Sequence, residues 1–123
     1  MKDKEQTVTI DKIVDAVKSY QSDADLDLIR RAYELAKNAH EGQTRNSGEA
    51  YIIHPLAVAR ILTRLKIDDV TISAAILHDV IEDTSYTLED MGKKFGSEVA
   101  MLIDGVTKLG RIQYKSKEEQ QLE

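Results

Sequence analysis

The sequence predicts an all-α fold, on three observations. First, it has one proline and no tryptophan among 123 residues, and its aromatic content is 5%. Second, its β-branched residues are interleaved with Ala, Leu, Lys and Glu, which favours helices over sheets. Third, apolar residues recur at helical spacing from Ile10 onward. The length fits one domain of roughly 100 to 150 residues, and we expect about six helices.

The first two helices are predicted by apolar stripes. Residues 10–20 follow Thr9, a plausible cap, and residues 23–40 end before Gly42, so His40 lies in the last turn of the second helix. Residues 41–50, EGQTRNSGEA, contain two glycines and no period, which predicts a surface loop.

Two more helices follow this loop. The third begins at His54-Pro55, because proline suits the first helical position. The fourth spans about 69–82, capped by Asp68 or Asp69, and its middle, VTISAAILHDVI, is apolar nearly all round, as in a helix buried at the centre of a fold.

The last two predicted helices have clear start signals. Thr87 and Asp90 resemble a capping box that opens a short helix ending at Gly96, and Ser97 caps the next one. The final residues, KSKEEQQLE, look like the first turns of a further helix without a stop signal. We therefore expect a fragment of a longer polypeptide.

Composition excludes several function classes. The net charge is −5 and the basic residues are scattered among acids, so nucleic acid is not an expected partner. Cysteine is absent, so any metal must be held by His, Asp or Glu. No apolar run approaches the roughly 18 residues of a membrane span, and the start, MKDKEQ, is polar. These features predict a cytoplasmic protein.

The segment from His78 to Asp83, HDVIED, carries the strongest chemical signal. It places four ionisable groups in and at the end of the most hydrophobic helix, where unpaired charges are costly and a cation would neutralise them. His78 and Asp79 are candidate ligands, and His54 is a third once the helices pack antiparallel. Mn, Fe, Zn and Mg all suit this donor set. Glu82 and Asp83 can orient or deprotonate a water molecule.

Each candidate also has a structural interpretation. Adjacent His and Asp occur by chance in many helices, and acids can simply end one. His54 before Pro55 can cap a turn, and His40 is better explained as a core or capping histidine than as a ligand. Arg45 can be a solvated charge, and Tyr51 can serve packing.

Three segments, EGQTRNSGEAYIIHP, LHDVIEDT and MLIDGVTKLGRIQYKSKEEQQ, resemble the hydrolase domain of RelA/SpoT homologues in the HD superfamily. The resemblance implies an all-helical, HD-domain-like fold and Mn²⁺-dependent hydrolysis of (p)ppGpp to GDP or GTP and pyrophosphate, as in long bifunctional enzymes. The resemblance implies that His54, His78 and Asp79 bind the metal and that Glu82 and Asp83 are the catalytic acids. It also implies a loop that binds the guanine nucleotide through Arg45, Asn46, Ser47 and Tyr51.

This chain departs from the family pattern in two important ways. Asn46 stands where such hydrolases usually have lysine, which removes one phosphate-facing charge; Ala50 in place of proline is minor. The family's last metal ligand, an Asp in a later helix, and an Asn-containing substrate segment are absent. We therefore interpret residues 1–123 as the N-terminal part of an HD hydrolase domain, without the synthetase and regulatory domains. This part alone should bind metal weakly, so that its site can stay unoccupied. It should also expose part of the apolar face of helix 69–82, which favours self-association.

Two other functions stay open. One is a non-catalytic regulatory HD module of a (p)ppGpp synthetase, which Asn46 and the missing Asp favour. The other is an HD phosphohydrolase that acts on other nucleotides.

Overall fold

The computed structural model describes residues 9–40 and 53–108, and within these ranges every regular element is a helix. The labelled helices are α2 (Ile10–Tyr20), α3 (Leu26–Ala39), α4 (Ile53–Arg64), α5 (Asp69–Asp83) and α6 (Leu88–Phe95). A further helix occupies 97–108. The predicted all-α class and the six expected helices are confirmed for this part of the chain.

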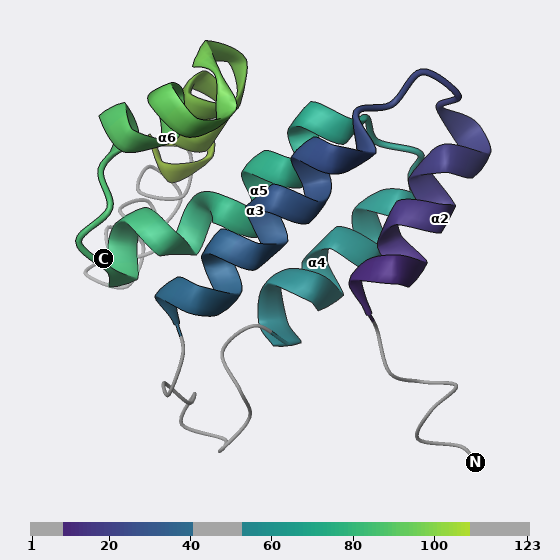
Figure 1. Cartoon of the computed structure of the whole chain (residues 1–123), viewed down its shortest axis with the longest axis horizontal. Coiled ribbons are helices and arrows are strands. Elements are labelled where there is room, and N and C mark those ends of the chain that lie inside the picture. The colour runs from purple at the N-terminus through teal and green to yellow at the C-terminus, as the bar shows by residue number, and fades with distance from the viewer. Residues whose placement is uncertain (1–8, 41–52, 109–123) are drawn as a thin grey trace, which may run out of the picture.

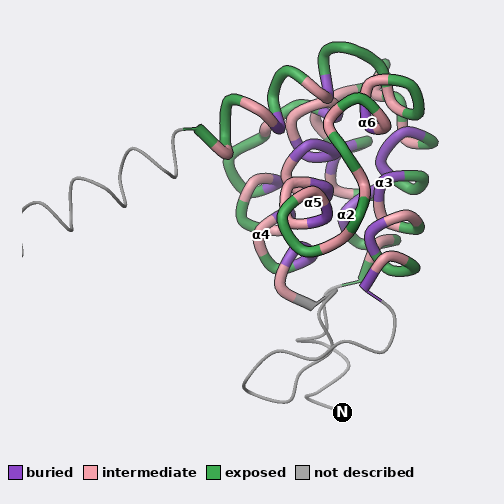
Figure 2. Tube along the Cα trace, turned by 90° about the vertical axis from the view of Figure 1, so that its left-hand side faces the viewer, coloured by how far each residue is buried: buried purple, intermediate pink, exposed green. Residues whose placement is uncertain are grey.

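Helix α5 forms the centre of the packing (Figure 1). It packs against α3 and α4, while α2 covers the other side of α3 and α4. Figure 2 shows the consequence: buried positions line the inner faces of the helices and exposed positions face outward. Helix α6 and the 97–108 helix lie together at one end (Figure 1). The predicted burial of the fourth helix is confirmed.

Side chains set most of the helix ends. Thr9 caps α2 by accepting a hydrogen bond from the Lys12 backbone N–H, as the sequence predicts. The predicted start of the second helix, residue 23, is three residues early because the carboxylate of Asp25 accepts from the Leu28 N–H and opens α3 at Leu26. The expected stop at Gly42 lies outside the described residues.

The later boundaries test the remaining predictions. Thr87 and Asp90 form the predicted capping box at the start of α6. Gly96 ends α6 with φ of 101°, a conformation open to glycine. The prediction that Ser97 caps the next helix is wrong by one residue, since the Gly96 carbonyl accepts from the Ala100 N–H and Ser97 is already helical.

The expected exposure of the apolar face of α5 is also wrong. Ile72, Ile76, Leu77 and Val80 are fully buried, because α3 and α4 cover this helix. Among the described residues, the large apolar side chains left exposed are elsewhere: Ile61, Leu65, Met101, Leu102 and Val106.

Candidate functional site

The last two turns of α5 carry the ionisable residues that the sequence singled out. His78 and Asp79 lie at the edge of the core, with side chains 23% and 17% exposed. Glu82 and Asp83, one turn further on, are exposed. Of the four groups predicted in and at the end of this helix, the first pair is thus partly buried and the second pair faces solvent.

His78 and Asp79 contact each other directly. Nδ1 of His78 donates to the Ala75 carbonyl at 2.7 Å, which turns Nε2 toward Asp79, 3.0 Å from its Oδ1. The hydrogen bond to Asp79 raises the pKa of His78 to about 9, against the effect of burial. The same bond lowers the pKa of Asp79. Adjacent helical residues do not usually face each other, so helical spacing alone did not predict this contact.

His54 comes to this end of α5 from the first turn of α4. The short connection 65–68 folds α4 back against α5, so the start of one helix meets the end of the other. Electrostatic interaction with His54 and with His40 adds to the effect of His78 in lowering the pKa of Asp79. Both histidines are thus within electrostatic reach of Asp79.

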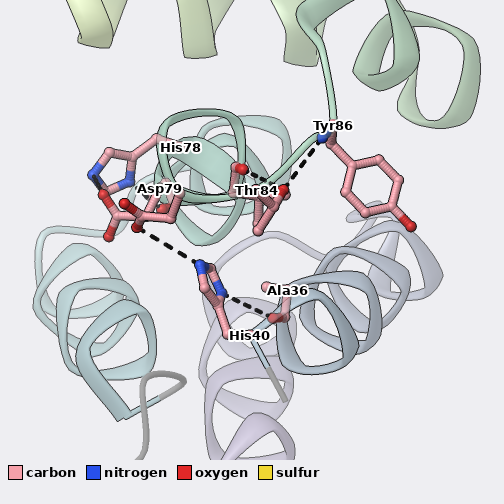
Figure 3. A network of polar contacts seen from close by, with 9 residues as sticks. Ala36, His40, His78, Asp79, Thr84 and Tyr86 are labelled. Carbon is pink, nitrogen blue, oxygen red and sulfur yellow. Dashed lines mark hydrogen bonds and ion pairs between the residues drawn. The ribbon is translucent and has the colours of Figure 1, made fainter. Parts of the chain in front are cut away.

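His40 approaches the same region from α3. It caps the C-terminus of α3, and its side chain is almost fully buried, so its interpretation as a core or capping residue is confirmed. Its Nδ1 bonds to the Ala36 carbonyl at 3.0 Å (Figure 3). Its Nε2 lies 3.7 Å from Oδ2 of Asp83. No sequence pattern indicates this contact with α5.

The donor set fits a divalent ion. Two ligand atoms that bind one ion at about 2.1 Å and at right angles lie about 3 Å apart, which is the separation of His78 Nε2 from Asp79 Oδ1. Within 9–40 and 53–108, no three His, Asp or Glu side chains converge closely enough to hold an ion. The pair therefore fits a metal, and a third ligand from His54 stays a prediction.

The predicted nucleotide loop falls outside the described residues. Arg45, Asn46, Ser47 and Tyr51 all lie within 41–52. Their roles stay predictions, and the candidate site consists here of the groups on α3, α4 and α5.

A second polar cluster, at the opposite end of α5, was not foreseen. The Asp69 carboxylate is buried and accepts from the Asp25 N–H at 2.6 Å and from Gln21 Nε2 at 3.1 Å. Gln21 Oε1 accepts in turn from the Asp69 N–H at 3.0 Å. This cluster joins the start of α5 to the α2–α3 connection, and its closed hydrogen bonding indicates a structural role. Its members lie far apart in the sequence, so no local pattern reveals them.

No helix in the described ranges combines the length and apolarity that a membrane crossing needs.

A family profile described as "HD domain" matches residues 32–123.

Several relatives share about half of the matched residues with this chain. The chain is 49% identical over 113 residues to a guanosine-3′,5′-bis(diphosphate) 3′-pyrophosphohydrolase of Vibrio cholerae, covering 92% of this chain and 16% of the relative. It is 50% identical over 107 residues to the bifunctional (p)ppGpp synthase/hydrolase SpoT of Escherichia coli, covering 87% and 15%. A GTP pyrophosphokinase of Myxococcus xanthus is 50% identical over 110 residues, covering 87% and 14%. The chain thus spans less than a fifth of these relatives' length.

Proposed function

Because this chain belongs to the HD domain family, we propose that it forms part of a cytoplasmic hydrolase domain that removes the 3′-pyrophosphate of (p)ppGpp. The observation that carries the proposal is the contact between His78 and Asp79 at the end of a buried helix, beside Glu82 and Asp83. The substrate is supported by the names of relatives that share about half of their matched residues with this chain.

We propose that residues 1–123 work within a longer protein. The matched region makes up 14% to 16% of the three relatives described above. Later helices would supply the last metal ligand, and synthetase and regulatory domains would complete the enzyme.

HD hydrolase domains depend on a divalent metal, and we propose Mn²⁺ held by His54, His78 and Asp79. The ion would supply Lewis acidity toward a phosphoryl oxygen and toward water. His78 and Asp79 suit this role because their facing atoms are already 3.0 Å apart. Burial of the helix beneath them limits their movement.

Glu82 and Asp83 are the proposed acid–base groups. Both are exposed at the end of α5, where a carboxylate can hold a water molecule and take its proton. The water oxygen bonds to the phosphorus that carries the 3′-oxygen, and the bond between that phosphorus and the 3′-oxygen breaks. The 3′-oxygen takes up a proton, which leaves GDP from ppGpp or GTP from pppGpp, with pyrophosphate as the other product.

The nucleotide-binding role falls to Arg45, Asn46, Ser47 and Tyr51. An arginine can pair with two phosphate oxygens at once. Asn46 adds no positive charge, so we expect weaker phosphate binding than in a protein with lysine at this position.

An assay on the protein that carries the complete domain tests the function. Pyrophosphate release from ppGpp with Mn²⁺ should fall about 10²- to 10⁴-fold in Glu82→Gln, with metal binding retained. Asp79→Asn should lose both metal and activity. Glu89→Gln is the matched control, because Glu89 is an exposed acid on α6 paired with Lys93. Absence of pyrophosphate release by the wild type, or equal rates for Glu82→Gln and Glu89→Gln, would refute the proposal.

A regulatory HD module is the second candidate, favoured by Asn46. Calorimetry with ppGpp separates the two, since a regulatory module binds the nucleotide without turnover. Faster cleavage of ordinary nucleoside phosphates would instead identify a phosphohydrolase of different specificity.

Residues 1–123 alone should bind Mn²⁺ weakly, because three ligands with an open side hold an ion poorly. Metal analysis after gel filtration measures this. Exposed Ile61, Leu65 and Met101 also favour self-association, and a monomer by light scattering would contradict that expectation.

A further inference from the structure

We propose that His40 is a positioning residue that keeps the carboxylate of Asp83 turned toward α3 and the neighbouring Asp79. The inference deepens the proposed function and rests on it, because Asp83 is there one of the two acid–base groups. Nothing in the sequence pattern connects residue 40 with residue 83; the contact arises from the packing of α3 against α5.

The imidazole of His40 is held rigidly by its own helix. The Ala36 carbonyl accepts the backbone N–H of His40 at 3.1 Å and its ring Nδ1 at 3.0 Å. Only 3% of the residue is exposed, so neighbouring groups block other ring orientations. Because a carbonyl only accepts, Nδ1 donates to it, and Nε2 can donate toward a carboxylate only in the protonated ring, in which both nitrogens carry a hydrogen. Nε2 is thereby directed away from α3 and toward α5 (Figure 3).

The position of Asp83 at the helix end bears on this contact. It is the last residue of α5, where the negative end of the helix dipole opposes a carboxylate and no following turn restricts it. Its side chain is 32% exposed and has Nε2 of His40 3.7 Å from Oδ2. That separation is within ion-pair range but longer than a hydrogen bond of about 2.9 Å, so the contact restricts the carboxylate while leaving it able to bind water.

The competing explanation is that His40 only caps α3 and fills the core. Two polar substitutions separate the explanations, because each keeps one of the two ring contacts. In His40→Asn, the amide nitrogen replaces Nδ1 and can still donate to Ala36, but the side chain is too short to reach Asp83. In His40→Gln, the amide nitrogen replaces Nε2 and can reach Asp83.

The rate test uses ppGpp hydrolysis by the protein with the complete domain. If His40 positions Asp83, kcat should fall about 10- to 100-fold in His40→Asn, with KM changed less than about twofold. His40→Gln should keep most of kcat. In an Asp83→Asn background the two variants should no longer differ, because the group they act through is gone. Equal losses in both variants, or better retention by His40→Asn, would overturn the inference.

A second measurement needs no turnover and keeps the inference separate from the proposed function. The side-chain carboxyl ¹³C resonance of Asp83 should shift in His40→Asn and stay near the wild-type value in His40→Gln. Asp83→Asn, a change at an exposed position that leaves the core intact, should shift the ¹⁵N resonance of His40 Nε2. If the wild type does not hydrolyse ppGpp but these shifts occur, the function fails and the contact stands. If the resonances do not respond, the contact fails whatever the enzyme does.

Discussion

Replacing Asp69 with alanine should destabilise this fold far more than the same change at its neighbour Asp68. Asp69 is 7% exposed, and its carboxylate accepts hydrogen bonds from the backbone N–H groups of Asp25 and Val70 and from the side chain of Gln21. These bonds join the start of α5 to the N-cap of α3. Asp68 is exposed, and its carboxylate accepts from Thr71 Oγ1 at 2.6 Å.

The expected magnitudes follow from what each alanine leaves behind. A buried donor without a partner costs about 1–3 kcal/mol, and Asp69→Ala removes the acceptor of three donors. Because water can reach part of this surface-proximal cluster, we expect a total of about 3–5 kcal/mol rather than the full sum. Asp68→Ala should cost less than about 1 kcal/mol, because Thr71 can bond to water instead.

Urea denaturation followed by circular dichroism at neutral pH measures both changes. A pH series adds a second check. Burial raises the pKa of Asp69, but the hydrogen bonds from Asp25 and Gln21 outweigh it and hold the pKa below its ordinary value of 3.8. A lowered folded-state pKa stabilises above the unfolded value and is lost as pH falls through the folded value. The advantage of wild type over Asp69→Asn should therefore shrink below about pH 4. Equal unfolding free energies for Asp69→Ala and Asp68→Ala would refute this reasoning.

The other predictions concern the helix ends and His78. Thr87→Ala, which removes the capping box of α6, should cost about 1 kcal/mol in urea denaturation. Gly96→Ala should cost about 1–3 kcal/mol through its φ of 101° alone, since an added Cβ meets nothing within 4 Å. Gly105→Ala is the control, because Gly105 lies in the 97–108 helix with equal space and no positive φ. This change should stabilise the fold by about 0.5–1 kcal/mol. His78 has its pKa raised from 6.5 to about 9, so in the metal-free chain its stabilisation should be complete below pH 6.5 and lost as pH rises through 9. His78→Gln should lack that decline, and unfolding free energies in chelator across this range test it.

Local signals were sufficient to predict most of the fold. Thr9, Thr87 and Gly96 act through bonds or backbone angles within a few residues, so the sequence reveals the ends they set. The start of α3 was misplaced because Asp23 and Asp25 can both cap a helix, and only the structure shows that Asp25 does so. Ser97 was misplaced for a similar reason, since a backbone carbonyl can open a helix without a side chain.

The sequence selects candidate site residues but not the contacts between them. The placement of His78 and Asp79 in an apolar helix was enough to select them, whereas their direct contact depends on side-chain rotamers. His40 was correctly interpreted as a buried capping residue, yet its approach to Asp83 depends on how α3 lies on α5. A sequence pattern reports the face that a residue occupies, and it carries no information about which side chain meets it across a helix interface.

The two ends of α5 differ in how their acidic residues interact with the helix dipole. At its start, Asp69 lies at the positive end of the helix dipole and is satisfied by donors from α5 itself and the α2–α3 connection. At its end, Asp79, Glu82 and Asp83 lie near the negative end of the dipole, where their charges oppose it. Among the described residues, three imidazoles from three helices lie close enough to act on those acids, namely His40, His54 and His78. Since His40 and His54 reach these acids only when α3 and α4 pack against α5, the same packing that buries α5 also brings two of the three imidazoles to its acidic last turn. A variant that loosens α3 from α5 should therefore disturb the acidic end before it unfolds the helix.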